Sequence, residues 1–460
     1  MSYQVPQHID KNKIFIVNRS EIEGRLDAQY YNENLDFSGF IKLSSVAVVK
    51  GGKRIPKGYG YSEDTTPYYY LRVADMDSDT QVDVNNLMSI SEDVFKILEK
   101  YEITEGELAI SIAGTIGKTT ILKNIPCGKR VILTENCAKI LVKQNVELLS
   151  EYLKICLELP IVKKQLDLNY IQTTIPKLGL DKIQGIRLPS IPCIQRQQEI
   201  VEYVNEANRK RQEKEKEAQR LLDGIDDYLL KELGVVIPGV ENELKNRIFL
   251  SSFSKIEGNR IDPMFSLYWG KNASSSKYEN ISLHSIAHIV KGNALSKSNV
   301  GLGNIPVIAG GQTSPYFHNQ ANYNGNIITV SASGAYAGYV WYHDYPIYAT
   351  DCCVIFSKEE ARFKTKYLFE VLKLQQKAIY KLQTGAAQPH VYAADLQMLN
   401  IPNVPIEKQQ EIIDYIVDIR TCAKKLQEDG KTILENAKRE IERMIIGDDG
   451  AWNRSYYGKL

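Results

Sequence analysis

The chain has 460 residues and 43% hydrophobic residues, and its 57 Lys and Arg against 56 Asp and Glu give a net charge of +1. This composition is that of a folded protein, and it excludes a strongly basic chain that coats nucleic acid without selectivity, so any nucleic-acid contact must use local patches. No run of 18 apolar residues predicts a membrane span, MSYQVPQHIDKNK lacks the apolar region of a signal peptide, and seven cysteines without a CxxC pair favour a reduced cytoplasmic protein.

The two halves of the chain repeat the same motifs in the same order. SEIEGRLDAQYY (20–31) returns as SKIEGNRIDPMF (254–265), and SSVAVVKGG (44–52) returns as SIAHIVKGN (285–293), which aligns Lys50 with Lys291. SIAGTIGK (111–118) has a looser counterpart in SASGAYAG (331–338), and LPSIPCIQRQQEIVEYV (188–204) matches IPNVPIEKQQEIIDYI (401–416). The match is strong at the ends of each half and weak in the middle, which is typical of one scaffold that carries two different variable surfaces.

Each globular half, roughly 12–190 and 245–400, mixes β-rich and helical segments. The β-rich runs are ELAISIA, ISLHSIAHIV and NIITVSA, and the helical runs are EYLKICLELPIVKKQL and KYLFEVLKLQQKAIYKL. We therefore predict an α+β fold with a first globular domain over 1–194, a long helix over 195–236, a second globular domain over 237–405, a long helix over 406–447 and a tail over 448–460.

The two long helices carry an apolar seam with a period of 3.5 residues. The seam includes Val204, Ala207, Leu221 and Ile225 in the first helix, and Ile416, Ile419, Leu426 and Ile433 in the second. Pro192 and Pro405 precede the helices, and Gly234 and Gly447 can end them. Arg211 and Lys214 interrupt the first seam, so we expect the helices to pair with each other. The alternative is that each helix packs only on its own globular half, although about 40 residues span roughly 60 Å.

Several catalytic motifs are incomplete. TIGKT (115–119) resembles the end of a P-loop, but Ile112 stands where glycine is required, so we expect a structural turn. DPMF (262–265) resembles the catalytic loop of amino-methyltransferases only in part and lacks the FxGxG cofactor loop. His284 and His288 have the spacing of a zinc pair without a third ligand, so we expect half-buried histidines, and Cys352-Cys353 favour core packing. We predict no catalytic residue and no metal site.

Basic and polar residues mixed with Tyr and Gly cluster at corresponding places in the two halves. Between Ile41 and Asp75 the chain has six Lys and Arg against three Asp and Glu, whereas the helices are acidic, with 8 against 10 over 195–234 and 8 against 9 over 407–446. Lys and Arg can neutralise phosphates, and Arg, Asn and Gln can read base edges. We therefore predict that the globular halves contact nucleic acid and the helices do not. The alternative for each residue is a solvated loop.

The residues that we predict from these clusters are Lys50, Lys53, Arg54, Lys57, Tyr59, Tyr61 and Arg72 in the first half, and Lys291, Asn293, Lys297, Ser298, Asn299, Gln312, Thr313 and Tyr316 in the second. Two loops that occupy matching positions before the long helices add Gln172, Thr173, Thr174 and Lys177, and Thr384, Gln388 and His390.

Two ordered sets of motifs resemble the specificity subunits of Type I restriction-modification systems over nearly the whole chain. The first set is VKGGKRIPKGYGY with PYYYLRVADM, then LAISIAGTIGKTTIL, then IQTTIPKLGLDKIQGIRLPSIPCIQRQQEI. The second set is NIPVIAGGQTSPYF, ITVSASGAYAG, TGAAQPHVYAADLQMLNIPNVP and EKQQEII. The second half departs from the pattern at Ala337 and Gly338, where the first half has Gly117 and Lys118.

The resemblance implies two mixed α/β target-recognition domains separated by a pair of long antiparallel, coiled-coil-like helices with pseudo-twofold symmetry. Each domain would read one half of a bipartite double-stranded DNA site, and the glycine turns add Thr115, Lys118, Ser333 and Tyr336 to the predicted DNA contacts. The helices would set the spacer and dock two DNA adenine methyltransferase subunits, to which restriction-translocase subunits can add. S-adenosylmethionine, ATP and Mg²⁺ would belong to these partners, and this chain would hold no cofactor.

Three other functions compete with this interpretation. The chain could be the equivalent subunit of a bifunctional restriction-methylation enzyme that cuts on both sides of its site. It could be a nucleotide-dependent DNA-modifying enzyme that uses TIGKT, which the residue at position 112 argues against. Finally, it could be a coiled-coil scaffold that binds no DNA, which would leave the two variable surfaces unexplained.

Overall fold

The computed structural model divides the chain into two compact units, each with one globular half and part of each long helix. Unit 1 comprises Met1–Glu213 and Asp429–Leu460, and unit 2 comprises Lys214–Glu428. The structure describes residues 37–76, 82–169, 176–235, 276–295, 303–314, 316–385 and 387–447, with Ile14, Ile16, Val17, Arg19, Ile22 and Gly301. The repeat at 20–31 and 254–265 lies outside them except for Ile22, as do DPMF and the predicted tail.

Two four-stranded sheets form the globular part of unit 1. The first sheet is antiparallel in the order β2-β9-β6-β7. The second has the order β4-β3-β8-β5, and β3 and β8 run parallel in it, while β1 and β10 form a separate antiparallel pair. The strands are β1 (Ile41–Lys42), β2 (Ala47–Gly51), β3 (Tyr68–Leu71), β4 (Met88–Ser89), β5 (Glu102–Ile103), β6 (Leu108–Ser111), β7 (Thr119–Ile121), β8 (Arg130–Leu133), β9 (Cys137–Val142) and β10 (Arg187–Leu188).

Short helices cover the sheets of unit 1. They are α2 (Leu43–Val46), α3 (Glu92–Leu98), α4 (Ser150–Glu158), α5 (Pro160–Asn169) and α6 (Leu180–Gln184), with 3-10 turns η2 (Val73–Asp75), η3 (Val84–Asn86) and η4 (Glu99–Tyr101). Helices α4 and α5 share a core with the first sheet, and α3 packs on β3 and β8 of the second. The helical run EYLKICLELPIVKKQL is divided at Pro160, because proline forces Leu159 into an extended conformation. Every residue of β6 and β7 is buried, and α4 contributes Leu153 and Leu157 to the same apolar core.

Unit 2 repeats this topology. Its antiparallel sheet has the order β12-β18-β15-β16, its second sheet has the order β14-β13-β17 with β13 and β17 parallel, and β11 pairs with β19. The strands are β11 (Asn280–Ser282), β12 (Ala287–Lys291), β13 (Ile305–Ile308), β14 (Phe317–His318), β15 (Ile327–Ser331), β16 (Val340–His343), β17 (Tyr348–Ala349), β18 (Cys352–Ser357) and β19 (Asn400–Pro402). The helices are α9 (Leu283–Ile286), α10 (Thr365–Leu374), α11 (Gln376–Tyr380) and α12 (Ala393–Gln397), and α9 interrupts the β-rich run ISLHSIAHIV.

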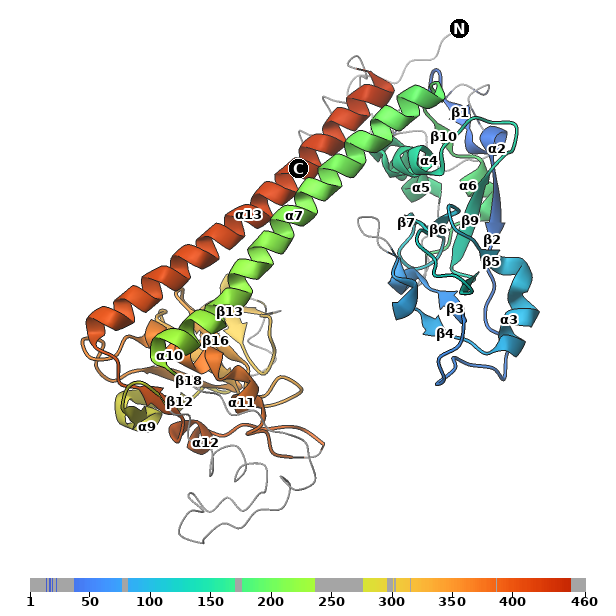
Figure 1. The fold of residues 1–460 in the computed structure, drawn as a ribbon. Coiled ribbons are helices and arrows are strands. Elements are labelled where there is room, and N and C mark those ends of the chain that lie inside the picture. Colours follow the sequence, from blue (N-terminus) through green and yellow to red (C-terminus); the bar gives the residue numbers. More distant parts are fainter. Residues whose placement is uncertain are drawn as a thin grey trace. The chain divides into compact units, whose positions relative to one another are not determined.

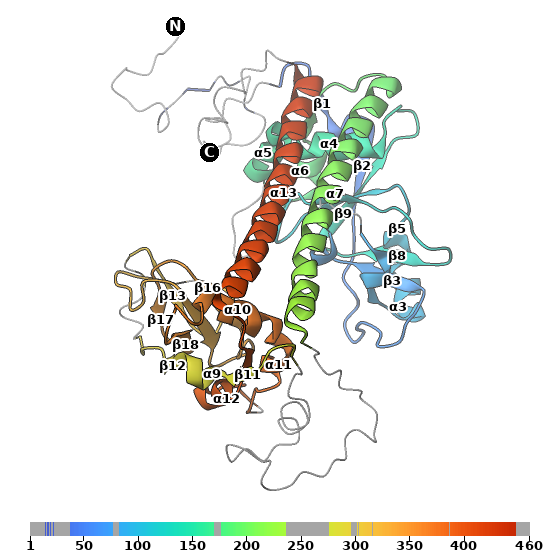
Figure 2. The ribbon, with the colours of Figure 1, turned by 60° about the vertical axis from the view of Figure 1, so that its left-hand side comes forward.

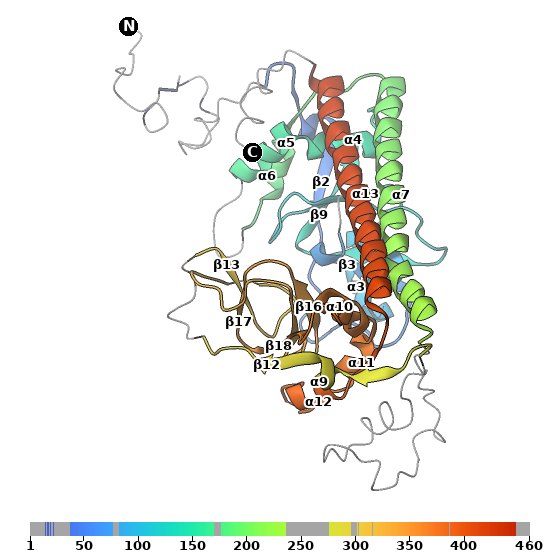
Figure 3. The same cartoon turned by 90° about the vertical axis from the view of Figure 1, so that its left-hand side faces the viewer.

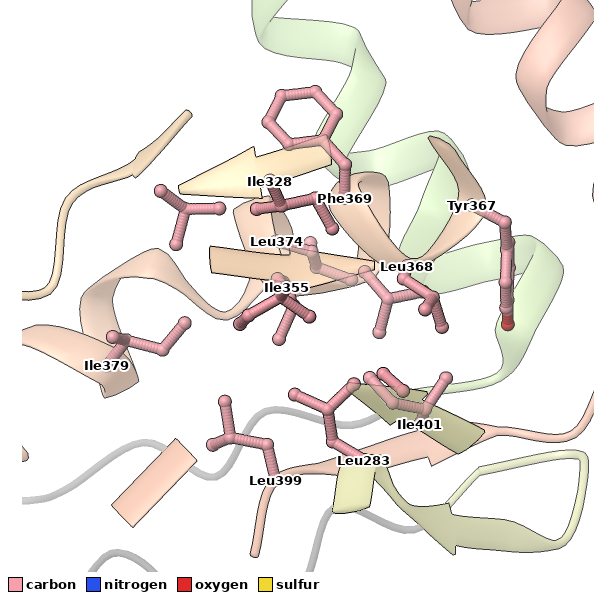
Figure 4. Close-up of a cluster of buried hydrophobic side chains, with 14 of the residues drawn as sticks. Leu283, Ile328, Ile355, Tyr367, Leu368, Phe369, Leu374, Ile379, Leu399 and Ile401 are labelled. Atoms are coloured by element: carbon pink, nitrogen blue, oxygen red, sulfur yellow. The ribbon is translucent and has the colours of Figure 1, made fainter. Parts of the chain in front are cut away.

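The core of unit 2 forms where α10 packs on the sheet (Figure 3). Ile328 of β15 and Ile355 of β18 face Leu368 and Leu374 of α10 (Figure 4). Leu283, Leu399 and Ile401 cover the cluster from the opposite side (Figure 4). The first and last segments of the second half therefore contribute side chains to the same core. The phenol of Tyr367, which is fully buried, donates to the carbonyl of Pro402 over 2.9 Å.

The long helices α7 (Ile194–Leu233) and α13 (Ile406–Ile446) pack side by side in each unit (Figure 1). In unit 1, Val204 and Ala207 of α7 and Ile433 of α13 share one core with α4 and α5. Figure 2 draws α4 and α5 beside these two helices. In unit 2, Ile225, Ile416 and Ile419 share the main core, and Leu221 and Leu426 pack in a second, smaller cluster. Tyr228 stacks on Tyr415 with ring centroids 4.0 Å apart. The start of α7 therefore lies against the end of α13, and the end of α7 against its start, so the helices are antiparallel.

The positions that continue the 3.5-residue spacing, from Ile200 to Tyr228 in α7 and from Ile412 to Glu440 in α13, are all at least half-buried. The helices end at Gly234 and Gly447, which adopt φ of +61° and +90°, as expected for glycines that terminate a helix. The predicted fold class is thus confirmed: two mixed α/β halves share one topology and two long helices pair. No helix among the described residues is long and apolar enough to cross a membrane.

The alignment of Lys50 with Lys291 is wrong by one residue. Ser45 Oγ donates to Lys42 O over 2.6 Å and Ser285 Oγ donates to Ser282 O over 2.7 Å, so Ser45 corresponds to Ser285. Gly52 and Gly292 then occupy the same place, each donating its N–H over 2.9 Å to the first residue of the neighbouring strand, and Lys50 corresponds to Val290. The alignment followed the Lys-Gly pair that both segments contain. An exposed lysine can occur at either of two neighbouring strand positions, whereas backbone hydrogen bonds fix the place of the glycine.

Candidate nucleic-acid interface

Loops gather at one edge of the sheets in unit 1, where hydrogen bonds join them. The N–H of Gly52 donates to Cys137 O over 2.9 Å, and the N–H of Thr134 donates to Leu71 O over 3.2 Å. Ile112 N–H donates to Asn136 O over 2.8 Å. Gly114 N–H donates to Pro176 O over 3.2 Å, which ties the glycine turn to the loop before α6. We call the segments 52–66, 72–76, 112–118, 134–136 and 176–179 the loop edge of unit 1.

Most residues predicted for the first half lie on this loop edge. The exposed ones are Lys53, Arg54, Lys57, Tyr59, Tyr61, Thr115 and Lys177, and Arg72 and Lys118 are half-buried. Lys50 is exposed but lies on β2, where it faces Lys139 of β9 across the sheet. Gln172, Thr173 and Thr174 lie outside the described residues. The fold therefore brings together side chains that are more than 100 residues apart in the sequence, and these side chains remain predictions for DNA contact.

Carboxylates hold the two arginines of this loop edge. Arg54 Nε donates to Glu135 Oε1 over 2.5 Å, and Arg72 donates twice to Asp75, from Nε over 2.9 Å and from Nη2 over 2.7 Å. Hydrogen bonding to Glu135 raises the pKa of Arg54, and hydrogen bonding to Asp75 raises that of Arg72. Partial burial pulls the pKa of Glu135 upward, but hydrogen bonds from Arg54, its own backbone and Thr134 outweigh burial, so the pKa lies below its usual value.

The same edge of unit 2 carries a corresponding set of loops. Gly292 N–H donates to Cys352 O over 2.9 Å, Thr350 N–H to Ile308 O over 2.9 Å, and Ala332 N–H to Asp351 O over 3.2 Å. Gly334 N–H donates to Pro389 O over 3.0 Å, which repeats the bond between the glycine turn and the loop before α12. The described residues of 292–295, 309–316, 332–339, 350–351 and 384–390 form the loop edge of unit 2.

The residues predicted for the second half also gather at this edge. Asn293, Gln312, Thr313, Tyr316, Tyr336 and Gln388 are exposed, Ser333 and His390 are half-buried, and Lys291 is exposed at the end of β12. Ser333 forms a β-bridge with His390, and its hydroxyl donates to the carboxylate of Asp351. Thr384 and His390 exchange backbone hydrogen bonds of 2.9 and 2.8 Å. Lys297, Ser298 and Asn299 lie outside the described residues.

Two acidic residues at these edges were missed by the sequence analysis. Glu135 follows Thr134 in unit 1, and Asp351 follows Thr350 in unit 2, each just before the strand that begins with a buried cysteine. Glu135 holds Arg54 and Asp351 holds Ser333. The recurrence of Thr followed by an acidic residue before Cys could have indicated them, but a carboxylate repels phosphates and is not itself expected at a nucleic-acid contact.

The glycine turn cannot cradle a phosphate. The N–H of Gly117 donates to Ser111 O over 3.0 Å, and the N–H of Lys118 donates to Ser111 Oγ over 2.9 Å, so both donors are already occupied. Gly114 and Gly117 adopt φ of +75° and +81°, which is typical of a tight turn. This supports the interpretation of TIGKT as a structural turn.

The structure also describes the histidine pair and the cysteine pair that the sequence offered as candidate sites. His284 and His288 are both exposed, so the expectation of half-buried histidines was wrong. The ring centroid of His288 lies 5.0 Å from that of Phe356 at the surface of the sheet. Cys352 and Cys353 are buried in the sheet. Over the part of the chain that the structure describes, no cluster of three His, Cys, Asp or Glu could hold a metal ion.

These features define the class of protein: a duplicated α+β chain in which one scaffold presents two loop edges with different residues. The family model for the Type I restriction modification DNA specificity domain matches residues 36–221 and 275–435, which is more than half of the chain. The chain therefore belongs to this family of Type I restriction-modification specificity subunits. A comparison with curated proteins found no match.

Solved structures of low sequence identity resemble the chain. A chain in the structure described as the basis of complex assembly and conformational transition of the type I R-M system is 14% identical, with 88% of this chain and 96% of that chain covered and a TM-score of 0.51, so the two share a fold. The Type I S subunit from M. genitalium is 13% identical, with 88% and 95% covered and a TM-score of 0.46. The HsdS subunit from Thermoanaerobacter tengcongensis is 14% identical, with 89% and 96% covered and a TM-score of 0.38.

Proposed function

We propose that this chain is the DNA sequence-recognition subunit of a Type I restriction-modification complex, in which each loop edge reads one half of a bipartite DNA site. The observation that carries the proposal is the recurrence of a loop edge at the same place in both units with different side chains. Unit 1 presents Lys53, Arg54 and Lys57, whereas unit 2 presents Asn293 and Gln312. Because the scaffold is repeated and the exposed side chains are not, the two units are suited to two different half-sites.

The two loop edges contain groups for both parts of DNA recognition. Exposed lysines can neutralise phosphates and set the position of the protein, and Arg, Asn and Gln can make paired hydrogen bonds to base edges in the major groove. The net charge of the chain is only +1, so non-specific affinity should be low. Specificity then depends on base contacts and on the deformation of the DNA.

The paired helices act as a ruler and as a dock in this proposal. They set the spacer between the half-sites and bind two DNA adenine methyltransferase subunits, to which restriction-translocase subunits can add. S-adenosylmethionine, ATP and Mg²⁺ belong to these partners. This chain itself catalyses no step, and the complex acts in the cytoplasm. The methyltransferase captures a flipped adenine while this subunit holds the flanking sequence.

Affinity purification of the tagged chain from its host tests this assembly. We expect a DNA adenine methyltransferase to co-purify, with native mass spectrometry giving two copies for each copy of this chain. The purified complex should retain one bipartite sequence from a random duplex library. Recovery of the chain without a methyltransferase, or a library that shows no enriched bipartite sequence, would refute the proposal.

A further inference from the structure

The guanidinium of Arg54 is fixed at Nε, while its two Nη groups are open to solvent. Its Nε donates to Glu135 Oε1 over 2.5 Å, and its side chain is 78% exposed. Within the described part of the chain, the two Nη groups of Arg54 donate to no other residue. A guanidinium held at Nε keeps two outward donors in one plane, which is the arrangement that pairs with O6 and N7 of guanine.

The support beneath Arg54 is rigid. The N–H of Lys53 donates to Leu133 O over 3.0 Å, and Lys53 O accepts from the phenol of Tyr70 over 2.8 Å, so the backbone next to Arg54 is anchored on both sides. Tyr70 is buried, and burial raises the pKa of its phenol to about 12, so it stays a donor at neutral pH. Glu135 is only 24% exposed; its Oε2 accepts from Thr134 Oγ1 over 3.1 Å and lies 3.3 Å from the phenol oxygen of Tyr70.

The ion pair contributes little to the stability of the fold. Exposed ion pairs are worth little, because water screens the charges and the long side chains lose freedom. Nevertheless, Glu135, Thr134, Tyr70 and the carbonyl of Leu133 together fix this one exposed arginine, either directly or through its neighbours. A positioned first contact supported by a second set of hydrogen bonds is typical of a recognition site, in which the readout depends on sub-ångström placement.

Neither Arg72 nor unit 2 has this arrangement. Arg72 gives both Nε and Nη2 to Asp75, so only one side of its guanidinium remains for a ligand. In unit 2 the position that follows Asn293 is Ala294, and Asp351 holds the hydroxyl of Ser333 instead of an arginine. Among the residues that the structure describes, the fixed arginine fork therefore belongs to unit 1 alone.

The geometry points to Arg54 as the residue by which unit 1 recognises one guanine in the major groove, with Glu135 as the residue that positions it. This inference rests on the proposed function. It goes beyond that function by assigning a base to a side chain: the half-site read by unit 1 contains a G·C pair that Arg54 contacts at O6 and N7.

Competition binding by the purified complex with its methyltransferase tests the assignment. Duplexes that carry 7-deazaguanine in place of each guanine of the bipartite site, one at a time, are compared with the unmodified duplex. For the wild-type complex we expect one guanine of one half-site at which the replacement weakens binding by about tenfold or more, as for a good bidentate contact. Arg54→Ala should remove this discrimination, Arg54→Lys should remove most of it because lysine has no planar fork, and Glu135→Ala should reduce it.

Two matched variants separate a reading role from a charge or folding effect. Lys57→Ala removes one positive charge from the same loop, and we expect it to weaken all duplexes equally while the discrimination at guanine stays. Glu135→Gln keeps an acceptor for Arg54 Nε, so we expect it to retain more discrimination than Glu135→Ala.

Each contrary result has its own meaning. If the wild-type complex binds no bipartite sequence, the proposed function itself is wrong. If the wild-type complex binds one and Arg54→Ala discriminates at every guanine as the wild type does, the assignment of Arg54 is overturned. If Glu135→Ala and Glu135→Gln both discriminate as the wild type does, the positioning role of Glu135 is overturned.

Discussion

Gly52 and Gly292 allow each loop edge to approach the end of a parallel strand pair. A Cβ at Gly52 would lie 2.1 Å from Thr134 O, and one at Gly292 would lie 2.2 Å from Thr350 O. The obstacle is backbone, so no side-chain rotation relieves it. We expect Gly52→Ala to lower the free energy of unfolding by about 1–3 kcal/mol, the usual cost of overpacking, as measured by urea denaturation.

Gly60→Ala is the matched control for this substitution. Gly60 belongs to the same loop, and nothing lies within 4 Å of a Cβ built there. Its effect should stay within about 0.5 kcal/mol, as for other exposed sites. Equal stability of the two variants would show that the strands separate without cost and that the glycine is not required.

His343 makes the stability of unit 2 depend on pH. It is buried, its Nε2 lies 2.8 Å from Thr329 Oγ1, and burial lowers its pKa to about 4 from an ordinary 6.5. The folded state therefore favours neutral histidine, so its contribution to stability is complete above pH 6.5 and is lost as the pH falls toward 4. We expect the wild type to lose about 3 kcal/mol more than His343→Gln over this range in urea denaturation. Equal losses would contradict the burial effect.

For single residues, the sequence indicates which side chains are candidates for DNA contact but not which side chains they bind in the fold. The excess of Lys and Arg between Ile41 and Asp75 pointed to Arg54. Glu135 could not be found in the same way, because it lies 81 residues from Arg54 and meets it only through the fold. Nor could the sequence show that Arg72 is occupied by Asp75, since an arginine and an aspartate three residues apart interact only in some turns.

Two buried glutamines fix the start of each long helix to the start of an earlier helix, α4 in unit 1 and α10 in unit 2. Gln197 Oε1 accepts from Leu149 N over 2.9 Å, just before α4, and Gln409 Oε1 accepts from Lys364 N over 2.9 Å, just before α10. Their Nε2 groups donate to two carbonyls each, at 2.8 to 2.9 Å. This explains why QQEI recurs in both halves of the sequence: the glutamine satisfies three backbone groups that are at least partly buried.

Removing either glutamine should open only its own unit. We expect Gln197→Ala to lower the free energy of unfolding by about 1–3 kcal/mol, because it leaves three partly buried backbone groups without their partner. Hydrogen exchange should increase around Leu149 in unit 1, and Gln409→Ala should have the same effect around Lys364 in unit 2. Gln198→Ala, at the exposed neighbouring position, is the control. Unchanged exchange in Gln197→Ala would contradict this role.

Elements were easier to predict than the contacts among them. The 3.5-residue seam and the flanking Pro and Gly indicated both long helices, since these signals are local. The first helix ends at Leu233, three residues before the predicted 236, because Gly234 terminates it. The helical turns α2 and α9 were missed, since four residues are too few for a periodic signal.

Both long helices pass from one unit to the other, α7 between Glu213 and Lys214 and α13 between Glu428 and Asp429. An insertion near Lys214 therefore acts on the link between the units and leaves both loop edges intact. Four inserted residues add about 6 Å to a helix. We expect such an insertion to change the spacer of the DNA site, measured by sequencing the duplexes that the complex retains, while both half-sites stay the same.

Gly224→Ala is the control for the insertion, because it changes an exposed position of α7 and keeps the helix length. It should leave the spacer unchanged. The same spacer in the insertion variant would refute the idea that the helices act as a ruler, and an altered half-site would show that the insertion disturbs a loop edge.

DNA recognition by this chain is tested most directly by a methylation map of host DNA with this gene intact and with it deleted. We predict that deletion removes N6-methyladenine from one bipartite motif, with two unlike half-sites and a fixed spacer, and that restoring the gene returns it. A bipartite motif that stays methylated after deletion would contradict the central claim, because another chain would then be reading the sequence.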